Sequence, residues 1–428
     1  MFFKILQKLN FKKNFPYFFC TPLIYGIGTA SDEISTAAAY AKISKKKLLL
    51  FKTTTFKGLL NYKVCNNALY DSLIINNQES NKNFLYQVID FFIQLEFVIR
   101  RILAISLKKI FKYDIGESFR FATIGTQDFF SEKKLLHYNK ILPLSIKEGK
   151  IDLGKKNKEQ CLKMLKLNGF QDKKFVCLHV RDGGYYKDGD RRSYRNSNIN
   201  NYIGLIELLI NKGYFVFRIG DNSASKINYE NKNFINYPFT ELKSEIMDLY
   251  LVKECTFYVG TPSGPYTTAD LFDKPVFLTN VNELYSAFPR KKFDRAISKK
   301  IIIKKTGKIL SIKDFARLNI HYHQTEVELG DIHFEENTSE ELCEAMNEYL
   351  NLIDNIRDLK NKKIFFHKNQ TELNKFLSLT LEKKYNEQVK KQNYFKNDHW
   401  KQSQFLRIVK RFKSCEGTFI SSFLKKNF

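Results

Sequence analysis

No stretch of about 18 or more uncharged apolar residues occurs in the 428-residue sequence, so it predicts no transmembrane helix. The seven cysteines are scattered, without a C-x-x-C pair or a histidine at metal-ligand spacing, which indicates a reducing compartment and no structural zinc. The N-terminus MFFKILQKLNFKK lacks a long apolar run and a small-residue cleavage site, so it is a poor secretion signal. These absences predict a cytoplasmic protein.

Acidic residues are few relative to basic ones, with 45 Asp and Glu against 71 Lys and Arg, for a formal net charge of +26. Such a balance is typical of proteins that bind nucleic acid or anionic membranes, but a lysine excess also fits a solvated surface. Hydrophobic residues at 43% and aromatic residues at 15% exclude a mainly disordered chain. The length is typical of two domains.

The central feature of the sequence is the segment from Phe175 to Tyr202. Its first residues, FVCL, form a short apolar run that predicts a buried strand of a parallel sheet. Polar and glycine residues follow at once: His179, Arg181, Asp182, Gly183 and Gly184. Ligands of open α/β sheets bind beyond the carboxyl ends of the strands, and a guanidinium matches two phosphate oxygens, so Arg181 is a candidate anion ligand. The alternative is a surface loop in which Arg181 pairs with Asp182, Asp188 or Asp190.

Further strand ends carry the same kind of residues. A strand expected over 214–217 runs into Arg218, Gly220 and Asp221, and one over 256–259 runs into a glycine-rich turn before a helix over 266–272. Helix N-termini favour anions. The remaining elements expected in this part are strands over 234–237 and 275–278, the latter ending at Asn280, and helices over 206–210 and 243–254. This alternation predicts a doubly wound parallel sheet.

The N-terminal part also opens as a β-α-β pattern. Strands are expected over 22–27 and 47–51, and the turn 28–31 leads into a helix over 32–43. A long helix is expected over 83–109, with its polar residues in one stripe. This helix is either a core helix or one that docks on a membrane or a partner.

The C-terminal part is helical in pattern. Thr338 and Glu341 form a capping box for a helix over 338–350. Basic and aromatic residues alternate over 400–428, as in helices that lie on an anionic bilayer, and an ordinary packing helix is the alternative. His321 and His323 have a spacing that could supply two metal ligands, but no carboxylate is placed to complete a site.

Five blocks in order resemble a family of bacterial glycosyltransferases of surface-polysaccharide biosynthesis: CLHVRDGGY, RNSNINNY, FRIGD, KSEIMDLYL and YVGTPSGPYTTADLFDKPVFLTN. The C-terminal GTFISSFLKKN resembles the ending of that family. More remotely, HVRD resembles the H-x-R-R-x-D motif of inverting fucosyltransferases, and GTPSG resembles the D-S-G segment of heptosyltransferase-like enzymes. Asp182 replaces the second Arg of the fucosyltransferase motif, so GDP-fucose is not implied as the donor.

The resemblance implies an α/β fold of the GT-B type, with two Rossmann-like domains facing across a cleft and C-terminal helices. Residues 1–168 would form the acceptor-side domain, 169–350 the nucleotide-sugar-binding domain and 351–428 a helical extension. The implied reaction is a metal-independent, inverting transfer of a sugar from a nucleotide-sugar to a hydroxyl of a glycan or lipid-linked glycan. No cofactor or nucleic acid takes part, and the enzyme would be cytoplasmic, with peripheral contact to the inner face of an anionic plasma membrane.

Two rival functions are a non-catalytic protein that binds nucleic acid or another anionic polymer, and a GT-B sugar-nucleotide epimerase. In the transferase, Arg181 and Asp182 would be catalytic, with Asp32 and Glu33 as candidates for the general base. The residues implied to bind the nucleotide-sugar are His179, Gly183, Gly184, Tyr185, Asn196, Tyr202, Arg218, Gly220, Asp221, Lys243, Ser244, Thr261, Ser263, Gly264 and Asn280. No residue is implied as a metal ligand.

Overall fold

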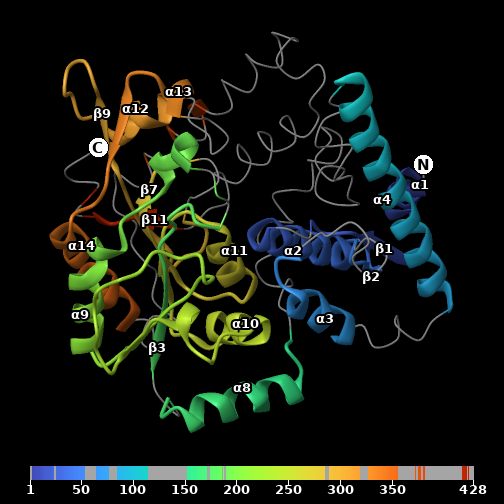
Figure 1. The fold of residues 1–428 in the computed structure, drawn as a ribbon, viewed down its shortest axis with the longest axis horizontal. Helices are drawn as coiled ribbons and strands as arrows, with labels where there is room; N and C mark the ends of the chain where they lie inside the picture. The colour runs from blue at the N-terminus through green and yellow to red at the C-terminus, as the bar shows by residue number, and fades with distance from the viewer. Residues whose placement is uncertain are drawn as a thin grey trace. The chain divides into compact units, whose positions relative to one another are not determined.

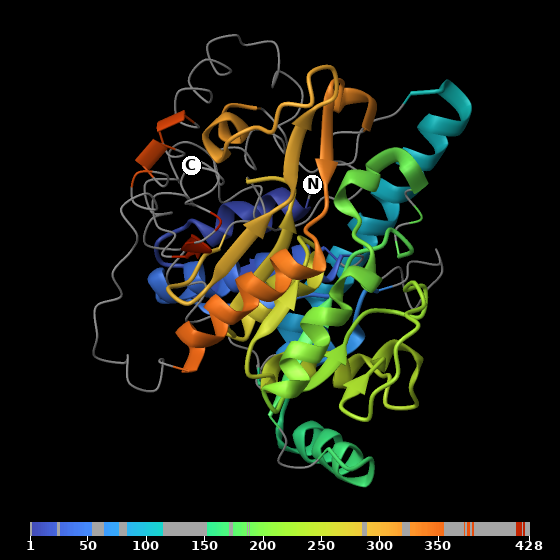
Figure 2. The same ribbon diagram turned by 90° about the vertical axis from the view of Figure 1, so that its left-hand side faces the viewer.

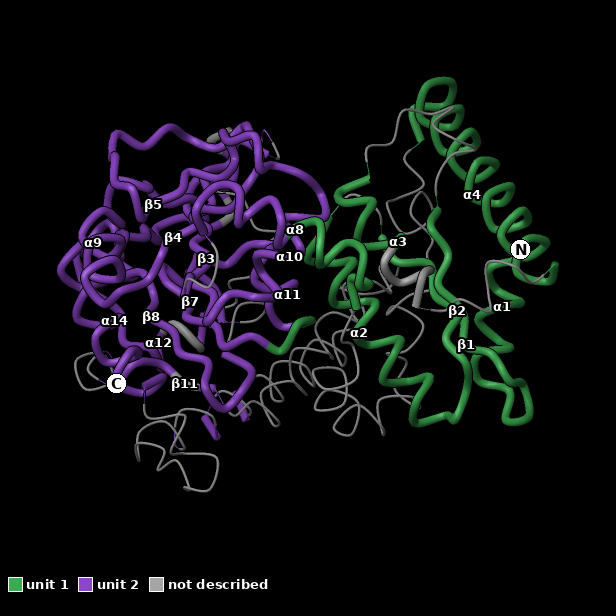
Figure 3. Tube along the Cα trace, turned by 90° about the horizontal axis from the view of Figure 1, so that it is seen from below, with its two compact units in different colours: residues 1–161, 271–273, 385–407 green, residues 162–270, 274–384, 408–428 purple. Residues whose placement is uncertain are grey.

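The computed structural model describes residues 2–23, 26–53, 64–76, 84–113, 152–170, 174–284 except 186 and 188, 289–318, 326–354, 417–421 and 423, with short pieces between 372 and 380. The chain divides into two compact units (Figure 3). Unit 1 comprises residues 1–161, 271–273 and 385–407, and unit 2 comprises residues 162–270, 274–384 and 408–428. The domain limits expected from the sequence, at residues 168 and 350, remain a prediction.

Unit 2 is built on a parallel sheet (Figure 1). Its seven strands lie in the order β11-β8-β7-β6-β3-β4-β5, and every pairing between neighbours is parallel. Their bounds are β3 Phe175–His179, β4 Phe215–Arg218, β5 Phe234–Ile235, β6 Tyr258–Gly260, β7 Val276–Val281, β8 Arg295–Ser298 and β11 Thr418–Phe419. The mixed α/β fold and the parallel sheet expected from the sequence are confirmed.

The order of the strands places a switch point next to β3. From β3 the chain builds β4 and β5 on one side, and then returns to build β6, β7 and β8 on the other side. In doubly wound sheets, ligands bind outside the carboxyl ends of the strands where the direction of winding reverses. The ends of β3 and β6 are therefore where a ligand site is expected.

Helices cover both faces of this sheet (Figures 1 and 2). α9 (Ile203–Asn211) and α14 (Ser339–Asp354) pack side by side on one face, and their buried side chains, such as Leu205 and Met346, join strand residues such as Val216 in one core. α10 (Glu245–Glu254) and α11 (Gly264–Leu271) lie on the other face.

The helix starts of unit 2 follow local sequence signals. The capping box of α14 is present, because Glu341 N donates to Thr338 Oγ1 at 3.2 Å and Thr338 N donates to Glu341 Oε2 at 3.0 Å. Smaller elements are α8 Lys155–Leu167, α12 Ile312–Arg317, α13 Glu326–Leu329, β9 Lys300–Ile303, β10 Ile332–Glu335 and the 3₁₀ turns η3 Gly189–Arg195, η4 Ile199–Tyr202 and η5 Tyr237–Phe239.

Two C-terminal predictions have different outcomes. The helix expected over 400–428 is wrong at Thr418 and Phe419, which form the edge strand β11 beside β8, and Ile420 is buried in the core. Residues 400–416 lie outside the described residues, as do His321 and His323.

Unit 1 begins with a parallel strand pair and its helices. The elements are α1 Phe2–Asn10, β1 Tyr17–Cys20, α2 Ile27–Ile43, β2 Lys47–Leu50, α3 Asn67–Asn76 and α4 Phe84–Phe111. Buried side chains of α1, both strands and α4 form one core, which includes Phe3, Phe19, Leu49 and Ile93. None of the helices in the described residues is both long enough and apolar enough to cross a membrane.

The strand expected over 22–27 is wrong, since β1 ends at Cys20 and α2 already begins at Ile27. A side chain at the end of α1 fixes β1, because Asn10 donates to Phe19 O at 2.8 Å and accepts from Phe19 N at 2.6 Å. The residues expected as a turn, 28–31, belong to α2.

Candidate functional site

The ends of β3 and β6 are joined at the switch point. Arg181 N donates to Thr261 Oγ1 at 2.9 Å, and Thr261 N donates to His179 O at 3.0 Å. A Cβ atom on Gly260 would lie 2.4 Å from His179 O, so only glycine lets the two backbones approach this closely. The predicted residues Arg181 and Thr261 are thus brought together by the sheet.

The Arg181 side chain is held by residues 196 and 197, which lie against the end of β3. Arg181 is only 5% exposed, and its Nη1 donates to Asn196 Oδ1. The same segment is anchored by Ser197 N, which donates to Arg181 O at 2.8 Å, and by Lys299 Nζ, which donates to Asn196 O at 2.6 Å. Asn196 therefore fixes one side of the guanidinium fork.

Asp182 connects the loop after β3 to the loop after β4. Its Oδ2 accepts from Ser225 N at 2.5 Å and Ser225 Oγ at 2.8 Å, and its Oδ1 accepts from Gly184 N at 3.1 Å. Burial alone would raise the pKa of Asp182, but these hydrogen bonds and the nearby charge of Arg218 hold the pKa below its usual value. Asp182 is consequently ionised at neutral pH.

The glycine after Asp182 has a packing role. A Cβ atom on Gly184 would lie 2.4 Å from Ser223 O, so the two loops touch through their backbones. The amide of Gly184, a residue that the resemblance implies in nucleotide-sugar binding, donates to Asp182. Gly183 has a positive φ of 80°, which favours glycine at this turn.

Two further predicted residues lie at the same edge of the sheet. His179 Nδ1 lies 3.1 Å from Ile219 O, and burial lowers the pKa of the imidazole. Arg218 is 1% exposed, its Nη1 donates to Asn236 Oδ1 at 3.2 Å, and its Nη2 has no hydrogen-bond partner in the described part of the chain. Burial lowers the pKa of Arg218, and the charge of Asp182 opposes that shift. Arg218 is therefore a second buried cation at the strand ends.

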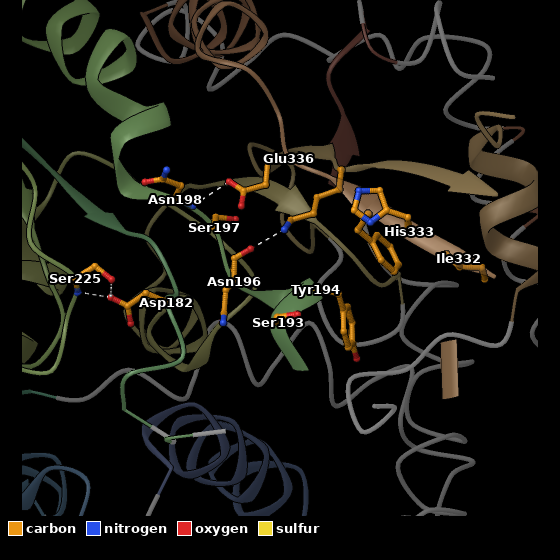
Figure 4. Close-up of a pocket in the computed structure, with 12 residues that line it drawn as sticks. Asp182, Ser193, Tyr194, Asn196, Ser197, Asn198, Ser225, Ile332, His333 and Glu336 are labelled. Carbon is orange, nitrogen blue, oxygen red and sulfur yellow. Dashed lines mark hydrogen bonds between the residues drawn. The ribbon is translucent and has the colours of Figure 1, made fainter. Parts of the chain in front are cut away.

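A pocket of about 390 Å³ opens beyond these strand ends (Figure 4). It is lined by Asp182, Ser193, Tyr194, Asn196, Ser197, Asn198, Ser225, Lys299, Ile332, His333, Phe334 and Glu336. Glu336 accepts from Asn198 N at 2.9 Å, and the ring of Tyr194 stacks on Phe334 with 5.5 Å between centroids. The lining thus combines hydroxyls, amides, two carboxylates and a lysine, as a polar, polyhydroxylated ligand requires.

Most of these lining residues were not predicted. Of the residues expected to bind a ligand, only Asp182 and Asn196 line the pocket. Asn196, Ser197 and Asn198 belong to the RNSNINNY segment, and Ser193 and Tyr194 directly precede it, so that signal could have found them. Lys299 and Glu336 carry no local signal, because they reach the pocket from segments more than 100 residues away along the chain.

Tyr202 and Asn280 form a buried polar network instead of lining the pocket. Asn280 Nδ2 donates to Tyr202 Oη at 2.9 Å, and Tyr202 Oη lies 2.7 Å from Thr279 Oγ1. Asn280, with a φ of 51°, also exchanges hydrogen bonds with Asn337 at 2.9 and 2.7 Å. This network fixes the end of β7 to the start of α14.

Residues predicted in the next two loops support local structure. Ser244 caps α10 by accepting from Met247 N at 3.2 Å, and Lys243 pairs with Asp248 at 2.5 Å. Asp221 closes its own turn by accepting from Ser223 N at 3.0 Å.

The other predicted residues in unit 2 lie around the same edge. Gly220, which follows β4, has a φ of +156°, and the Cβ position built on it lies 3.9 Å from His179 Nδ1. Tyr185 is 47% exposed. Ser263 precedes α11, which begins at Gly264 directly after the turn that follows β6. The helix N-terminus expected after this strand is therefore confirmed.

Asp32 and Glu33 lie in α2 of unit 1. Glu33 is 2% exposed and accepts from Leu23 N at 2.8 Å, so its carboxylate fixes the segment after β1. Asp32 is the more exposed of the two. Among the residues that the structure describes, no group of three or more His, Cys, Asp or Glu is arranged to hold a metal ion.

Comparisons with known proteins do not assign the chain to a family. No family model matches the chain, and no curated protein matches it. A solved structure of a dodecameric iron-containing heptosyltransferase, TibC, in complex with ADP-D-beta-D-heptose matches at 15% identity with a TM-score of 0.25. The match spans 45% of this chain and about half (48%) of that one. A TM-score this low does not establish a shared fold.

Proposed function

We propose that this protein is a GT-B glycosyltransferase that moves a sugar from a nucleotide-sugar to a hydroxyl of a growing surface glycan. The observation that carries the proposal is Arg181. Its guanidinium stands at the switch point of a parallel sheet, is nearly buried, and is oriented by Asn196. A preorganised arginine at this position suits the diphosphate of a nucleotide-sugar.

Charges and dipoles at the strand ends support binding of a diphosphate. Arg218 is a second buried cation at the end of β4, and the N-terminus of α11 follows the end of β6. Both favour an anion at the carboxyl edge of the sheet. We therefore assign the diphosphate to this edge and propose that these groups, without a metal ion, neutralise it.

The pocket supports recognition of the hydroxyl-bearing part of the donor. Carboxylates such as Asp182 and Glu336 accept hydrogen bonds from hydroxyls, and the side chains of Ser193 and Asn198 supply shorter polar contacts. The stacked ring of Tyr194 adds an apolar surface for a sugar or base. Because Asp182 is ionised, it serves as an acceptor and not as an acid.

The reaction would be a single displacement at the anomeric carbon, with inversion. The acceptor oxygen forms a bond to that carbon while the bond to the diphosphate oxygen breaks, and the acceptor proton passes to a general base. Negative charge grows on the departing diphosphate, so the Arg181 contacts strengthen in the transition state and accelerate the reaction. Asp32 is the proposed base, because it is the more exposed of the two candidate carboxylates of α2.

A ligand panel tests this proposal. Purified protein is heated with nucleoside diphosphates, with their sugar conjugates, and with a single-stranded RNA of matched phosphate content. We expect stabilisation by one class of nucleotide-sugar and its nucleoside diphosphate, since a ligand that binds only the folded state raises the melting temperature. Stabilisation by RNA alone would favour the nucleic-acid-binding rival and end the proposal.

A second step separates transfer from epimerisation. The stabilising nucleotide-sugar is incubated with the protein, with and without glycan acceptors, and the products are analysed by mass spectrometry and NMR. Release of nucleoside diphosphate that depends on acceptor supports transfer. An isomerised nucleotide-sugar formed without acceptor would assign the chain to the epimerases.

A further inference from the structure

Helix α4 buries polar residues together with the core residues Ile89, Ile93 and Phe97, and it exposes a broad apolar side. Gln94, Glu96 and Arg101 are 7%, 9% and 3% exposed, although the sequence grouped Gln94 and Arg101 in a polar stripe. On the outer side, ten large apolar side chains are at least 44% exposed: Phe84, Leu85, Phe91, Phe92, Ile99, Ile102, Leu103, Ile105, Ile110 and Phe111. We call these ten residues the apolar face of α4.

The apolar face is long and nearly continuous. At 3.6 residues per turn, all its members except Phe111 fall within about half of the helix circumference, and 28 residues extend over about 42 Å. The polar side chains within this sector are only Gln87, Ser106 and Lys109. An exposed apolar surface of this extent marks a site of interaction.

Specific contacts explain why the polar stripe points inward. Glu96 accepts from Phe3 N at 2.8 Å and pairs with Arg100 at 2.6 Å. Gln94 Nε2 donates to Lys52 O at 2.5 Å and to Asp90 Oδ1 at 3.0 Å. These bonds attach α4 to α1 and to the segment after β2, so α4 cannot turn its apolar face into the core without breaking them.

The charged residues around the apolar face have one sign. α1 lies beside α4, with 5.4 Å between the ring centroids of Phe2 and Phe92. Over residues 2–13 and 84–113, every exposed charged side chain is a lysine: Lys4, Lys8, Lys12, Lys13, Lys108, Lys109 and Lys112. The carboxylates in these ranges, Asp90 and Glu96, are at least partly buried.

We propose that the apolar face of α4, flanked by these lysines, docks flat on an anionic lipid bilayer. An interfacial helix combines aromatic and aliphatic residues on one face with basic residues that reach anionic headgroups. A second copy of the chain fits less well, because two such surfaces would bring lysines together without an acidic partner. Insertion across the bilayer is opposed by the polar residues on the inner side of α4. The proposal is independent of the glycosyltransferase assignment.

The test uses the full chain and two kinds of vesicle, phosphatidylcholine alone and phosphatidylcholine mixed with phosphatidylserine. We expect sedimentation with the mixed vesicles at least about tenfold stronger than with the neutral ones, and weaker binding as salt rises. Phe91→Gln combined with Ile102→Gln should abolish binding, since both lie at the centre of the apolar face and are 53% and 51% exposed. Ile309→Gln combined with Phe239→Gln is the matched control, because these side chains in unit 2 are similarly exposed, at 53% and 46%.

Two additional measurements check that the variants are folded and that α4 itself contacts the lipid. Circular dichroism and melting temperature confirm that each variant is folded, as expected for substitutions at exposed positions. Phe91→Trp should give a fluorescence blue shift with the mixed vesicles and none with the neutral ones. Equal binding to both vesicles, or full binding by the double variant, would refute the proposal, and a concentration-dependent dimer that the Phe91→Gln and Ile102→Gln pair dissociates would assign the face to a second copy instead.

Discussion

Replacing Arg181 separates its proposed role in donor binding from its role in the fold. Arg181→Ala removes the charge-assisted hydrogen bond to Asn196 and leaves the Asn196 Oδ1 atom without this donor in a nearly buried site. A bond of this type is worth about 1.5–3 kcal/mol, so we expect the free energy of unfolding to fall by about that amount. The same substitution removes the contact to the diphosphate, which should weaken donor binding about tenfold to two-hundredfold.

Arg181→Lys distinguishes charge from geometry. A lysine keeps the positive charge, but its ammonium cannot contact Asn196 and a phosphate with the fixed planar fork of a guanidinium. We therefore expect Lys to restore part of the stability and little of the donor affinity. An effect confined to binding would raise KM, whereas a contact that strengthens in the transition state would also lower kcat.

Isothermal titration with the donor that stabilises the protein most measures the affinity, and urea unfolding measures the stability. Arg317→Ala is the control, because Arg317 is an arginine of unit 2 whose side chain is 60% exposed and pairs with Asp314 on the surface at 2.8 Å. We expect it to change stability by less than about 0.5 kcal/mol and affinity not at all.

A double-mutant cycle tests whether Asn196 orients Arg181. If Asn196 acts by orienting Arg181, Asn196→Ala should weaken donor binding, and the double variant should be little worse than Arg181→Ala alone. If Arg181→Ala loses stability but binds the donor with unchanged affinity, then the guanidinium is only structural and the proposed function has lost its main support.

Three further predictions concern the same loops. Transferase activity should survive EDTA, because Arg181 and Arg218 supply the positive charges that neutralise the diphosphate. A loss of activity that manganese restores would contradict this and would point to the D-x-D spacing at residues 188–190 as a metal site. Asp182→Asn should destabilise the protein at neutral pH and less so in acid. The pKa of Asp182 is lowered in the folded state, so the stability that the ionised carboxylate contributes is lost as the pH falls through that pKa. A difference in urea midpoint between variant and parent that does not change with pH would refute this prediction. Gly184→Ala should cost roughly 1–3 kcal/mol, since the new methyl meets Ser223 O at 2.4 Å, and a melting temperature equal to the parent protein would contradict that contact.

Sequence patterns were sufficient for five strands of the parallel sheet of unit 2, β3 to β7, but not for β8 and β11. Strands such as Phe175–His179 and Val276–Val281 are short apolar runs, and in a parallel sheet covered on both faces such runs have few alternatives to burial. The start of α14 was equally readable, because Thr338 caps the backbone locally. Arg181 and Thr261 were both expected at strand ends, but their contact follows from the strand order, which places β6 beside β3.

The rest of the pocket required the tertiary structure. Lys299 and Glu336 reach residues 196 and 198 across separations of 103 and 138 residues, and no local pattern encodes such contacts. The position of β1 was also missed; in the structure the side chain of Asn10 bonds to the backbone of Phe19 and holds the strand at Tyr17–Cys20.

Helix α4 separates what the sequence determined from what the tertiary structure decided. Its sequence determined a helix close to Phe84–Phe111 and the residues that share each face, because both follow from a period of 3.6 residues. Which face turns inward was decided by partners elsewhere in the chain: Ile89, Ile93 and Phe97 pack into the core, the amide of Phe3 donates to Glu96, and the carbonyl of Lys52 accepts from Gln94. A buried polar group without a hydrogen-bond partner destabilises the fold. The hydrogen bonds of Glu96 and Gln94 therefore hold α4 with its apolar face exposed.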